Sequence, residues 1–164
     1  MVMLLRPERG GFRRPFGCGQ FIYSYLSGQG PHDSPAINPS QGAPQSDIFY
    51  YYKKALIKET ALNMATVKEE KQAKREKRQI DPDTIESLTD KYLKRIPYKS
   101  KGCRYHSFVT YFSLLIRLEW VEFTGQVEQS EFYRGQSRRY YRLTASGAAA
   151  SDSAWSNPYR ALYG

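Results

Sequence analysis

Apolar residues recur at helical spacing through the middle of the chain, and they alternate with polar residues along two short stretches nearer its C-terminal end. The helical period over residues 47–80 predicts one long helix. A second helix is predicted after Asp81, because Asp81 is a good N-cap and Pro82 suits the first helical position. This helix should end before Pro97, since the residue preceding a proline avoids the helical conformation.

The stretch RYHSFVTYFSLLIRLEW, residues 104–120, predicts a third helix with two unlike faces. At about 100° per residue, one face collects aromatic and aliphatic side chains within about 60° of Phe108. This core face consists of Tyr105, Phe108, Tyr111, Phe112 and Leu115. The opposite face carries a polar stripe formed by His106, Thr110, Ser113 and Arg117. A solvent-facing stripe usually mixes Glu with Lys, whereas this one has no acid, which favours a polyanionic partner.

Two strands are predicted after the third helix. WVEFT, residues 120–124, alternates as a short strand, and SRRYYRLT, residues 137–144, supplies the second strand after a polar loop. Because successive side chains of a strand point to opposite faces, the second strand divides its residues between two faces. One of these faces carries Arg139, Tyr141 and Leu143.

The two ends of the chain carry weaker patterns. Residues 1–46 are predicted to be weakly structured, apart from the apolar run FIYSYL at 21–26, which fits a helix or a strand. The Gly-, Pro- and Ser-rich stretch that follows predicts a flexible linker, because it buries too little surface to offset its ordering entropy. In the tail, residues 148–164, Trp155 and Tyr159 are expected to dock onto the body of the protein.

The positive charge of the chain is concentrated in two segments. The formal net charge is +9, which favours DNA, RNA or an anionic membrane surface as the partner. Residues 91–117 carry seven basic and no acidic side chains, and residues 132–142 carry four arginines. Four glutamates lie between them, over residues 118–131. The chain is therefore a local polycation and not a uniformly basic protein.

The predicted helix over 47–80 has two unlike halves. FYYYKKAL, residues 49–56, supplies tyrosines that are expected in a core or at a homodimer contact, with base stacking as the alternative. KEEKQAKREKRQ, residues 68–79, is almost wholly polar, with i,i+4 pairs such as Glu70–Lys74. Such pairs predict a solvated helix. The alternative is an arm that lies on nucleic acid, although its acids nearly balance its bases.

The segments YFSLLIRLEWVE and RRYYRLTASG resemble the winged-helix transcription regulators of the PadR and MarR type. The resemblance covers about residues 81–147. It implies a mainly α fold with a small two-stranded β-wing, in which a winged helix-turn-helix follows the long extra helix over 47–80. The sequence departs from the family's pattern at Glu119, where the family has glycine, and at residues 96–103, where the turn between helices is longer.

The resemblance implies binding to double-stranded DNA, with the third helix in the major groove and the wing against the backbone or the minor groove. The recognition residues would be Arg104, His106, Thr110, Ser113 and Arg117. The phosphate-binding residues would be Lys99, Lys101, Arg134, Arg138, Arg139 and Arg142. Arg138 and Arg142 are the better phosphate candidates, because Arg139 shares its strand face with Tyr141 and Leu143.

No residue pattern in the sequence predicts catalysis. Cys18, Cys103, His32 and His106 lack the spacing of a metal site, and no nucleophile has a catalytic context. The chain is therefore predicted to be no enzyme and to need no cofactor. No apolar run approaches the ~20 residues that span a bilayer, which predicts a cytoplasmic protein without a membrane partner. The predicted function is sequence-specific DNA binding by a transcriptional regulator; the alternatives are a winged-helix protein-interaction module and an RNA- or ribosome-binding protein.

Overall fold

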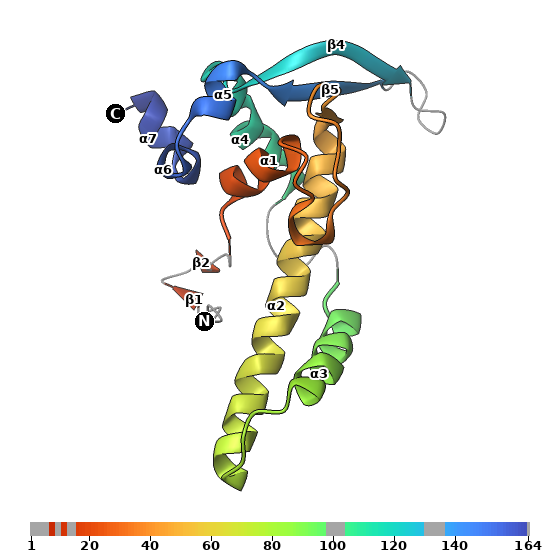
Figure 1. Ribbon diagram of the computed structural model, residues 1–164, viewed down its shortest axis with the longest axis vertical. Helices are drawn as coiled ribbons and strands as arrows, with labels where there is room; N and C mark the ends of the chain where they lie inside the picture. The colour runs from red at the N-terminus through yellow and green to blue at the C-terminus, as the bar shows by residue number, and fades with distance from the viewer. Residues whose placement is uncertain (1–6, 9–10, 13–15, 98–103, 130–136, 164) are drawn as a thin grey trace. The chain divides into compact units, whose positions relative to one another are not determined.

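The structure is a computed structural model that describes residues 7–8, 11–12, 16–97, 104–129 and 137–163. It is mainly helical, with a small three-stranded antiparallel sheet (Figure 1). The chain divides into two compact units. We call them the helical unit, Met1–Phe16 and Lys53–Gly102, and the sheet unit, Gly17–Tyr52 and Cys103–Gly164.

Most of the secondary structure lies in the sheet unit. Its elements are α1 (Cys18–Leu26), the 3-10 turn η1 (Pro31–Asp33), β3 (Ala43–Pro44), the start of α2 (Gln45–Glu76), α4 (Tyr105–Arg117), β4 (Val121–Gln129), β5 (Ser137–Leu143), α5 (Ala145–Ala149), α6 (Asp152–Ser156) and α7 (Pro158–Tyr163). The helical unit contains β1 (Pro7–Glu8), β2 (Gly11–Phe12), the rest of α2, and α3 (Pro82–Arg95). The boundary between the units therefore falls inside α2.

Aromatic side chains form the core of the sheet unit. Phe108 and Phe112 of α4 are fully buried, with ring centroids 6.0 Å apart. Phe49, in the first turns of α2, has its ring centroid 5.3 Å from that of Phe108. The ring of Tyr52 lies 5.3 Å from the ring of Phe21 in α1. These contacts place the tyrosine-rich start of α2 in a core shared with α1 and α4, which was one of its two predicted roles.

The sheet has the strand order β3–β5–β4. β4 and β5 form a hairpin with a bulge between Phe123 and Val127. Gly42, just before β3, has a φ of +74°, and a Cβ at this position would lie 2.0 Å from the carbonyl oxygen of Tyr141. Glycine is needed here because only glycine lets β3 approach β5 so closely. The two strands predicted as a wing therefore belong to a sheet of three.

The structure differs from the expectation of a weakly structured segment over residues 1–46. α1, η1 and β3 all lie within it. Ile22 and Leu26 are fully buried, so the run FIYSYL contributes directly to the core. Between α1 and β3 the chain is shaped by turns, as where the Ser34 hydroxyl donates to the carbonyl oxygen of Pro31 at 2.5 Å. Composition misled the prediction, because Gly, Pro and Ser build defined turns as readily as flexible linkers.

Structure at the C-terminal end is more extensive than predicted. β4 continues beyond Thr124, because its pairing with β5 resumes after the bulge. The tail forms the three short helices α5, α6 and α7. Trp155 of α6 is 1% exposed, with its ring centroid 4.8 Å from that of Trp120, which confirms its docking. Its indole N–H donates to the carbonyl oxygen of Gly147 at 2.9 Å. Tyr159 is 48% exposed, but its ring lies edge-on to that of Tyr111 in α4, at a centroid distance of 6.2 Å, which confirms its docking as well.

In the helical unit, α2 ends at Glu76, and α3 begins at Pro82 and runs back in the opposite direction (Figure 1). Asp81 caps α3 as predicted, because its Oδ1 accepts a hydrogen bond from the N–H of Asp83 at 3.1 Å. α2 ends earlier than predicted, since Lys77 takes a φ of +54° and leaves the helical conformation.

The residues predicted as one winged-helix domain, 81–147, fall in both units. α3 belongs to the helical unit, whereas α4, β4 and β5 belong to the sheet unit. Within the sheet unit, aromatic side chains from the start of α2 contact the aromatic rings of α4. Hydrophobic periodicity did not indicate this division, because a period marks which face of a helix is apolar and not which neighbour covers it.

Candidate nucleic-acid interface

α4 has a buried face and an exposed face, as its sequence predicts. Phe108, Phe112 and Leu115 are each 0% exposed. Tyr105 is 47% exposed, with its ring edge-on to that of Phe49 at a centroid distance of 5.1 Å. Burial is the main cause that raises the pKa of the Tyr105 hydroxyl. Three fully buried anchors hold the opposite face of α4 in a defined orientation within the sheet unit.

The polar stripe of α4 is exposed at His106, Thr110, Ser113 and Arg117. The Thr110 hydroxyl donates to the carbonyl oxygen of His106 at 3.1 Å, and the Ser113 hydroxyl donates to that of Val109 at 2.9 Å. Each hydroxyl thus donates its hydrogen to a carbonyl oxygen of the helix, but its oxygen lone pairs can still accept a hydrogen bond from a partner. Arg117 forms no ion pair with any residue that the structure describes.

The predicted residues that flank this stripe are only partly described. Arg104 is the N-cap residue of α4 and is exposed, with an extended backbone. Lys99, Lys101 and Arg134 were also predicted to bind phosphate, and all three lie outside the described residues. Most of the long turn at 96–103 lies outside them as well.

The turn from α4 to β4 is built at Glu119. This residue has a φ of +60°, the left-handed conformation that favours glycine. Its carbonyl oxygen accepts a hydrogen bond from the Thr144 hydroxyl, and its N–H donates to the carbonyl oxygen of Ile116 at 3.0 Å. Glu119 therefore adopts a backbone conformation that glycine would take without strain, although its own side chain disfavours it.

On one face of the β4–β5 hairpin, arginines are neutralised by acids. Arg142 Nε lies 3.0 Å from Oε1 of Glu122, the residue opposite it in the sheet. Arg138 Nη1 lies 2.6 Å from Oδ1 of Asp47, and its Nη2 lies 3.1 Å from Oε1 of Glu128, the residue opposite. We call this the paired face. Arg138 and Arg142, predicted as the better phosphate ligands, therefore already hold carboxylates.

A tyrosine strengthens the paired face. The Tyr140 hydroxyl donates to Oε2 of Glu128 at 2.5 Å. Hydrogen bonds from Tyr140 and Arg138 lower the pKa of the Glu128 carboxyl, and the same carboxylate raises the pKa of the Tyr140 hydroxyl. A phosphate that approached Arg138 would have to displace an ionised, hydrogen-bonded carboxylate. The sequence did not reveal this pairing, because the acids come from another strand and from α2.

The opposite face of the hairpin is different. Arg139 is exposed, and its guanidinium carbon lies 5.5 Å from the centre of the Phe123 ring. Phe123 is 42% exposed and Val127, opposite Arg139 in the sheet, is 46% exposed. Among the residues that the structure describes, no carboxylate forms an ion pair with Arg139. Arg139 does share a strand face with Tyr141, as predicted, and its side chain is exposed.

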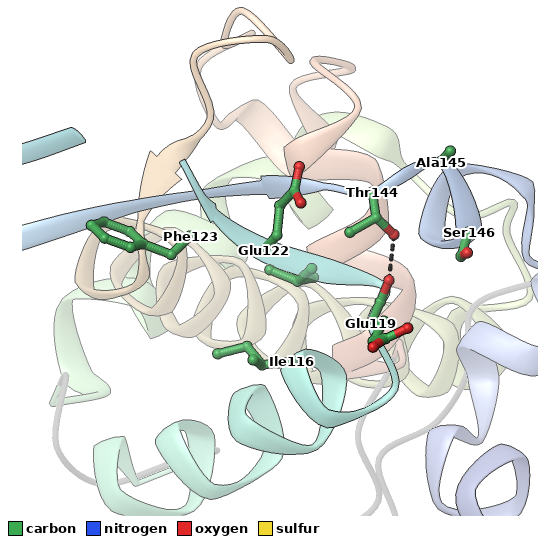
Figure 2. Close-up of a pocket in the computed structure, with 8 residues that line it drawn as sticks. Ile116, Glu119, Glu122, Phe123, Thr144, Ala145 and Ser146 are labelled. Atoms are coloured by element: carbon green, nitrogen blue, oxygen red, sulfur yellow. Dashed lines mark hydrogen bonds between the residues drawn. The ribbon is translucent and has the colours of Figure 1, made fainter. Parts of the chain in front are cut away.

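A shallow cavity of about 500 Å³ opens beside the end of α4 (Figure 2). Ile116, Phe123, Glu119 and Glu122 contribute to its lining, and Figure 2 shows Glu119 joined to Thr144 by the hydrogen bond described above. Glu122 is already paired across the sheet with an arginine. In the described part of the chain, no group of three or more His, Cys, Asp or Glu side chains could hold a metal ion.

Comparisons with known proteins assign no family to this chain. No family model, no curated protein and no solved structure matches this chain. Among the described helices, none has the length and apolar character needed to cross a membrane. The sheet unit therefore offers two candidate contact surfaces to interpret: the exposed stripe of α4 and the outer face of the hairpin around Arg139.

Proposed function

We propose that the sheet unit is a winged-helix domain whose sequence is interrupted between its second and third helices. From α1 to β5, its α-helices and strands follow the order helix, strand, helix, helix, strand, strand, and β5 lies between β3 and β4. This order and this sheet suit a winged helix in which α1, the start of α2 and α4 are the three helices. The resemblance to PadR- and MarR-type regulators then applies to α4, β4 and β5, and residues 53–102 are the interruption.

The packing at the start of α2 supports this assignment. Phe49 contacts two rings of α4, those of Tyr105 and Phe108, at centroid distances of 5.1 and 5.3 Å. Tyr52, one turn further along, lies 6.2 Å from Phe108. In this assignment, the start of α2 takes the role that the sequence pattern had suggested for α3, that of the helix preceding the proposed recognition helix.

We infer that this domain binds double-stranded DNA as a transcriptional regulator, with α4 in the major groove. The observation that carries the proposal is the exposed, acid-free stripe of α4, which lies opposite three fully buried anchors and leads directly into the β4–β5 hairpin. A helix fits the major groove, where base edges are read by arginine and by short polar side chains.

Each residue of the stripe suits a different contact. Arg117 can donate two parallel hydrogen bonds to a guanine, while the lone pairs of Thr110 and Ser113 can accept from exocyclic amines. His106 can donate or accept, according to its tautomer. On the hairpin, Arg139 is the described arginine whose charge no carboxylate offsets, so it is the best placed for the DNA backbone.

The proposal is tested by selecting preferred duplexes from a random library and measuring their affinities for single variants. Arg117→Ala and Thr110→Ala should each change which bases are preferred, whereas Arg139→Ala should weaken all duplexes about equally. Ser107→Ala is the matched control, because Ser107 is exposed on α4 but lies off the stripe. If the two stripe variants select the same duplexes as the wild type, α4 is not a recognition helix.

A protein-interaction module is the second candidate function. The sheet unit has seven basic and seven acidic side chains, so its net charge does not attract DNA. Ile116, Phe123 and Val127 also leave apolar surface exposed beside the stripe. This candidate predicts no sequence preference in the selection, together with binding to a protein partner that Phe123→Ala abolishes.

A further inference from the structure

The net positive charge of the protein resides in the helical unit. Residues 53–102 carry 14 basic and eight acidic side chains, whereas the sheet unit carries equal numbers of each. A polyanion is therefore attracted by charge to the helical unit, independently of any contact that α4 makes. Six of these basic side chains lie over residues 68–78, in the last turns of α2 and just beyond them, together with three acidic side chains.

We propose that the last turns of α2 form a second DNA contact, a basic strip that binds the duplex backbone through Lys68, Lys71 and Arg75. The spacing i, i+3, i+7 places these residues within about 60° of one another and along about 10 Å of helix. All three are exposed, and none forms an ion pair among the described residues. The acidic Glu70 lies on the other side of the helix.

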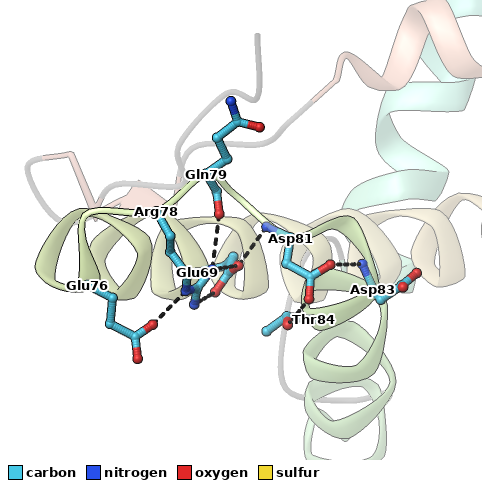
Figure 3. Close-up of polar contacts among 7 residues, drawn as sticks. All are labelled: Glu69, Glu76, Arg78, Gln79, Asp81, Asp83 and Thr84. Atoms are coloured by element: carbon cyan, nitrogen blue, oxygen red, sulfur yellow. Dashed lines mark hydrogen bonds and ion pairs between the residues drawn. The ribbon is translucent and has the colours of Figure 1, made fainter.

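The other two acids in these turns are held by one arginine (Figure 3). Arg78 makes a bidentate contact with Glu69, at 2.8 and 3.0 Å, and a third hydrogen bond to Glu76 at 2.6 Å. Glu69 is 1% exposed, and its Oε2 also accepts from the N–H of Asp81 at 2.8 Å. These bonds lower the pKa of Glu69 to about 2. Arg78 thus binds both carboxylates and offsets one of their two negative charges, which would otherwise oppose the charge of the basic strip.

The helix dipole accounts for one residue of the basic strip, Arg75, and local pairing among the described residues accounts for none of the three. Cations in the last turn of a helix offset its dipole, which explains Lys74 and Arg75. Lys68 and Lys71 precede the last turn, beyond the reach of that effect. The pair that the sequence suggested, Glu70 with Lys74, forms no salt bridge among the described residues. The cations are therefore available to an external polyanion.

The chemistry of the basic strip fits the backbone of duplex DNA. Duplex DNA carries about one negative charge per 1.7 Å of its axis. At this charge density, several closely spaced cations can contact phosphates at the same time. Lysine and arginine contacts to phosphate supply affinity without reading the sequence. The inference rests on the proposed function in one respect, that duplex DNA is the partner of the chain.

The experiment measures the affinity of the full-length chain for a labelled duplex of mixed sequence between about 50 and 200 mM salt. The variant K68Q/K71Q/R75Q should bind at least about tenfold more weakly at the low end of this range. Its salt dependence should become shallower by about 0.9 in log–log slope for each phosphate that the variant no longer neutralises. The preferred sequence selected from a random library should remain that of the wild type.

The matched control is K91Q/K94Q/R95Q, which removes the same charge from exposed positions on α3 of the same unit. Circular dichroism of both variants checks that their helices are retained. Equal decreases in affinity for the two variants would show that the basic strip is not a local DNA contact. The proposal would also be overturned if the first variant lost affinity for phosphatidylserine vesicles but not for the duplex. Unchanged binding by the first variant would also overturn it, even where stripe variants of α4 alter sequence preference. A chain that binds through the basic strip but shows no sequence preference would contradict the proposed function alone.

Discussion

The sheet unit and the helical unit are organised by different interactions. In the sheet unit, three helices and the sheet surround buried aromatic rings, among which Phe108 and Phe112 are fully buried. In the helical unit, the turn between α2 and α3 is organised around one buried carboxylate, that of Glu69, and around Arg78, which donates two hydrogen bonds to it. The first arrangement is non-directional and depends on area, whereas the second depends on a few directed, charge-assisted bonds.

Charge also divides the two units. The sheet unit is neutral in total, and its hairpin arginines at 138 and 142 are bound to carboxylates. The helical unit carries the net charge, with a strip of cations that no described residue neutralises. In the DNA-binding function that we propose, the sheet unit supplies the sequence preference and the helical unit supplies affinity for the phosphate backbone.

The largest expected effect is on the aromatic core. Phe112→Ala should destabilise the protein by about 3–5 kcal/mol, because it removes a fully buried ring and leaves a cavity. Thermal or chemical unfolding followed by circular dichroism measures the change. Phe123→Ala is the control, since that ring is 42% exposed and should cost much less. Equal destabilisation by the two substitutions would show that the hairpin ring is as important to the core as Phe112.

Next in size is the contrast between two arginines of the sheet unit. Under the proposed function, Arg117→Ala should weaken binding to a preferred duplex by about 1–3 kcal/mol, because it would remove the base contact that we propose for Arg117. Arg142→Ala should have a much smaller effect, since its charge is already offset by Glu122. Fluorescence anisotropy on the same duplex compares the two. A greater decrease in affinity from Arg142→Ala would mean that phosphate displaces the carboxylates of the paired face.

A smaller effect is expected at the turn between α4 and β4. Glu119→Gly should stabilise the sheet unit by about 1 kcal/mol, because a side chain in the left-handed conformation is strained. The denaturation midpoint measures the gain. Glu122→Gly is a suitable comparison, because it removes a strand carboxylate without relieving such strain. Destabilisation by Glu119→Gly would indicate that the carboxylate of Glu119 contributes more than its backbone strain costs.

The most local effect concerns pH in the helical unit. Because the pKa of Glu69 is lowered from 4.5 to about 2, its ion pair stabilises the turn above pH 4.5, and this contribution is lost as the pH falls towards 2. The protection factors of the backbone N–H groups of residues 77–81 against hydrogen exchange should therefore decrease over that range. In the Glu69→Gln variant, the same N–H groups should have low protection factors at every pH, with little further change on acidification. A wild-type turn that stays protected at pH 2 would contradict this role for Glu69.

Periodicity predicted α4 well because an amphipathic helix encodes both of its faces locally. Phe108, Phe112 and Leu115 are buried, and the stripe through Thr110 is exposed, as their spacing requires. Strand alternation also separated Arg139 from its neighbours Arg138 and Arg142 correctly. These features depend only on helical and strand repeats, which hold whatever the element packs against.

The state of the hairpin arginines could not be predicted in the same way. Arg138 meets Asp47, which lies on a different helix, and Glu128, which lies opposite only because of the strand register. The sequence showed four arginines on one short stretch and no acid among them, so their charge seemed uncompensated. Pairing between distant residues follows from the sheet and not from composition.

The sequence alone predicted the helices α2, α3 and α4, the strands β4 and β5, the two faces of α4 and the uneven distribution of charge. Each of these follows from the local repeat of the backbone or from counting. Tertiary structure alone decided that the start of α2 packs on α4, that β3 joins the sheet through Gly42, and that Arg78 holds Glu69 and Glu76. The physical reason is that burial and ion pairing depend on which distant segments meet, and only the folded chain brings them together.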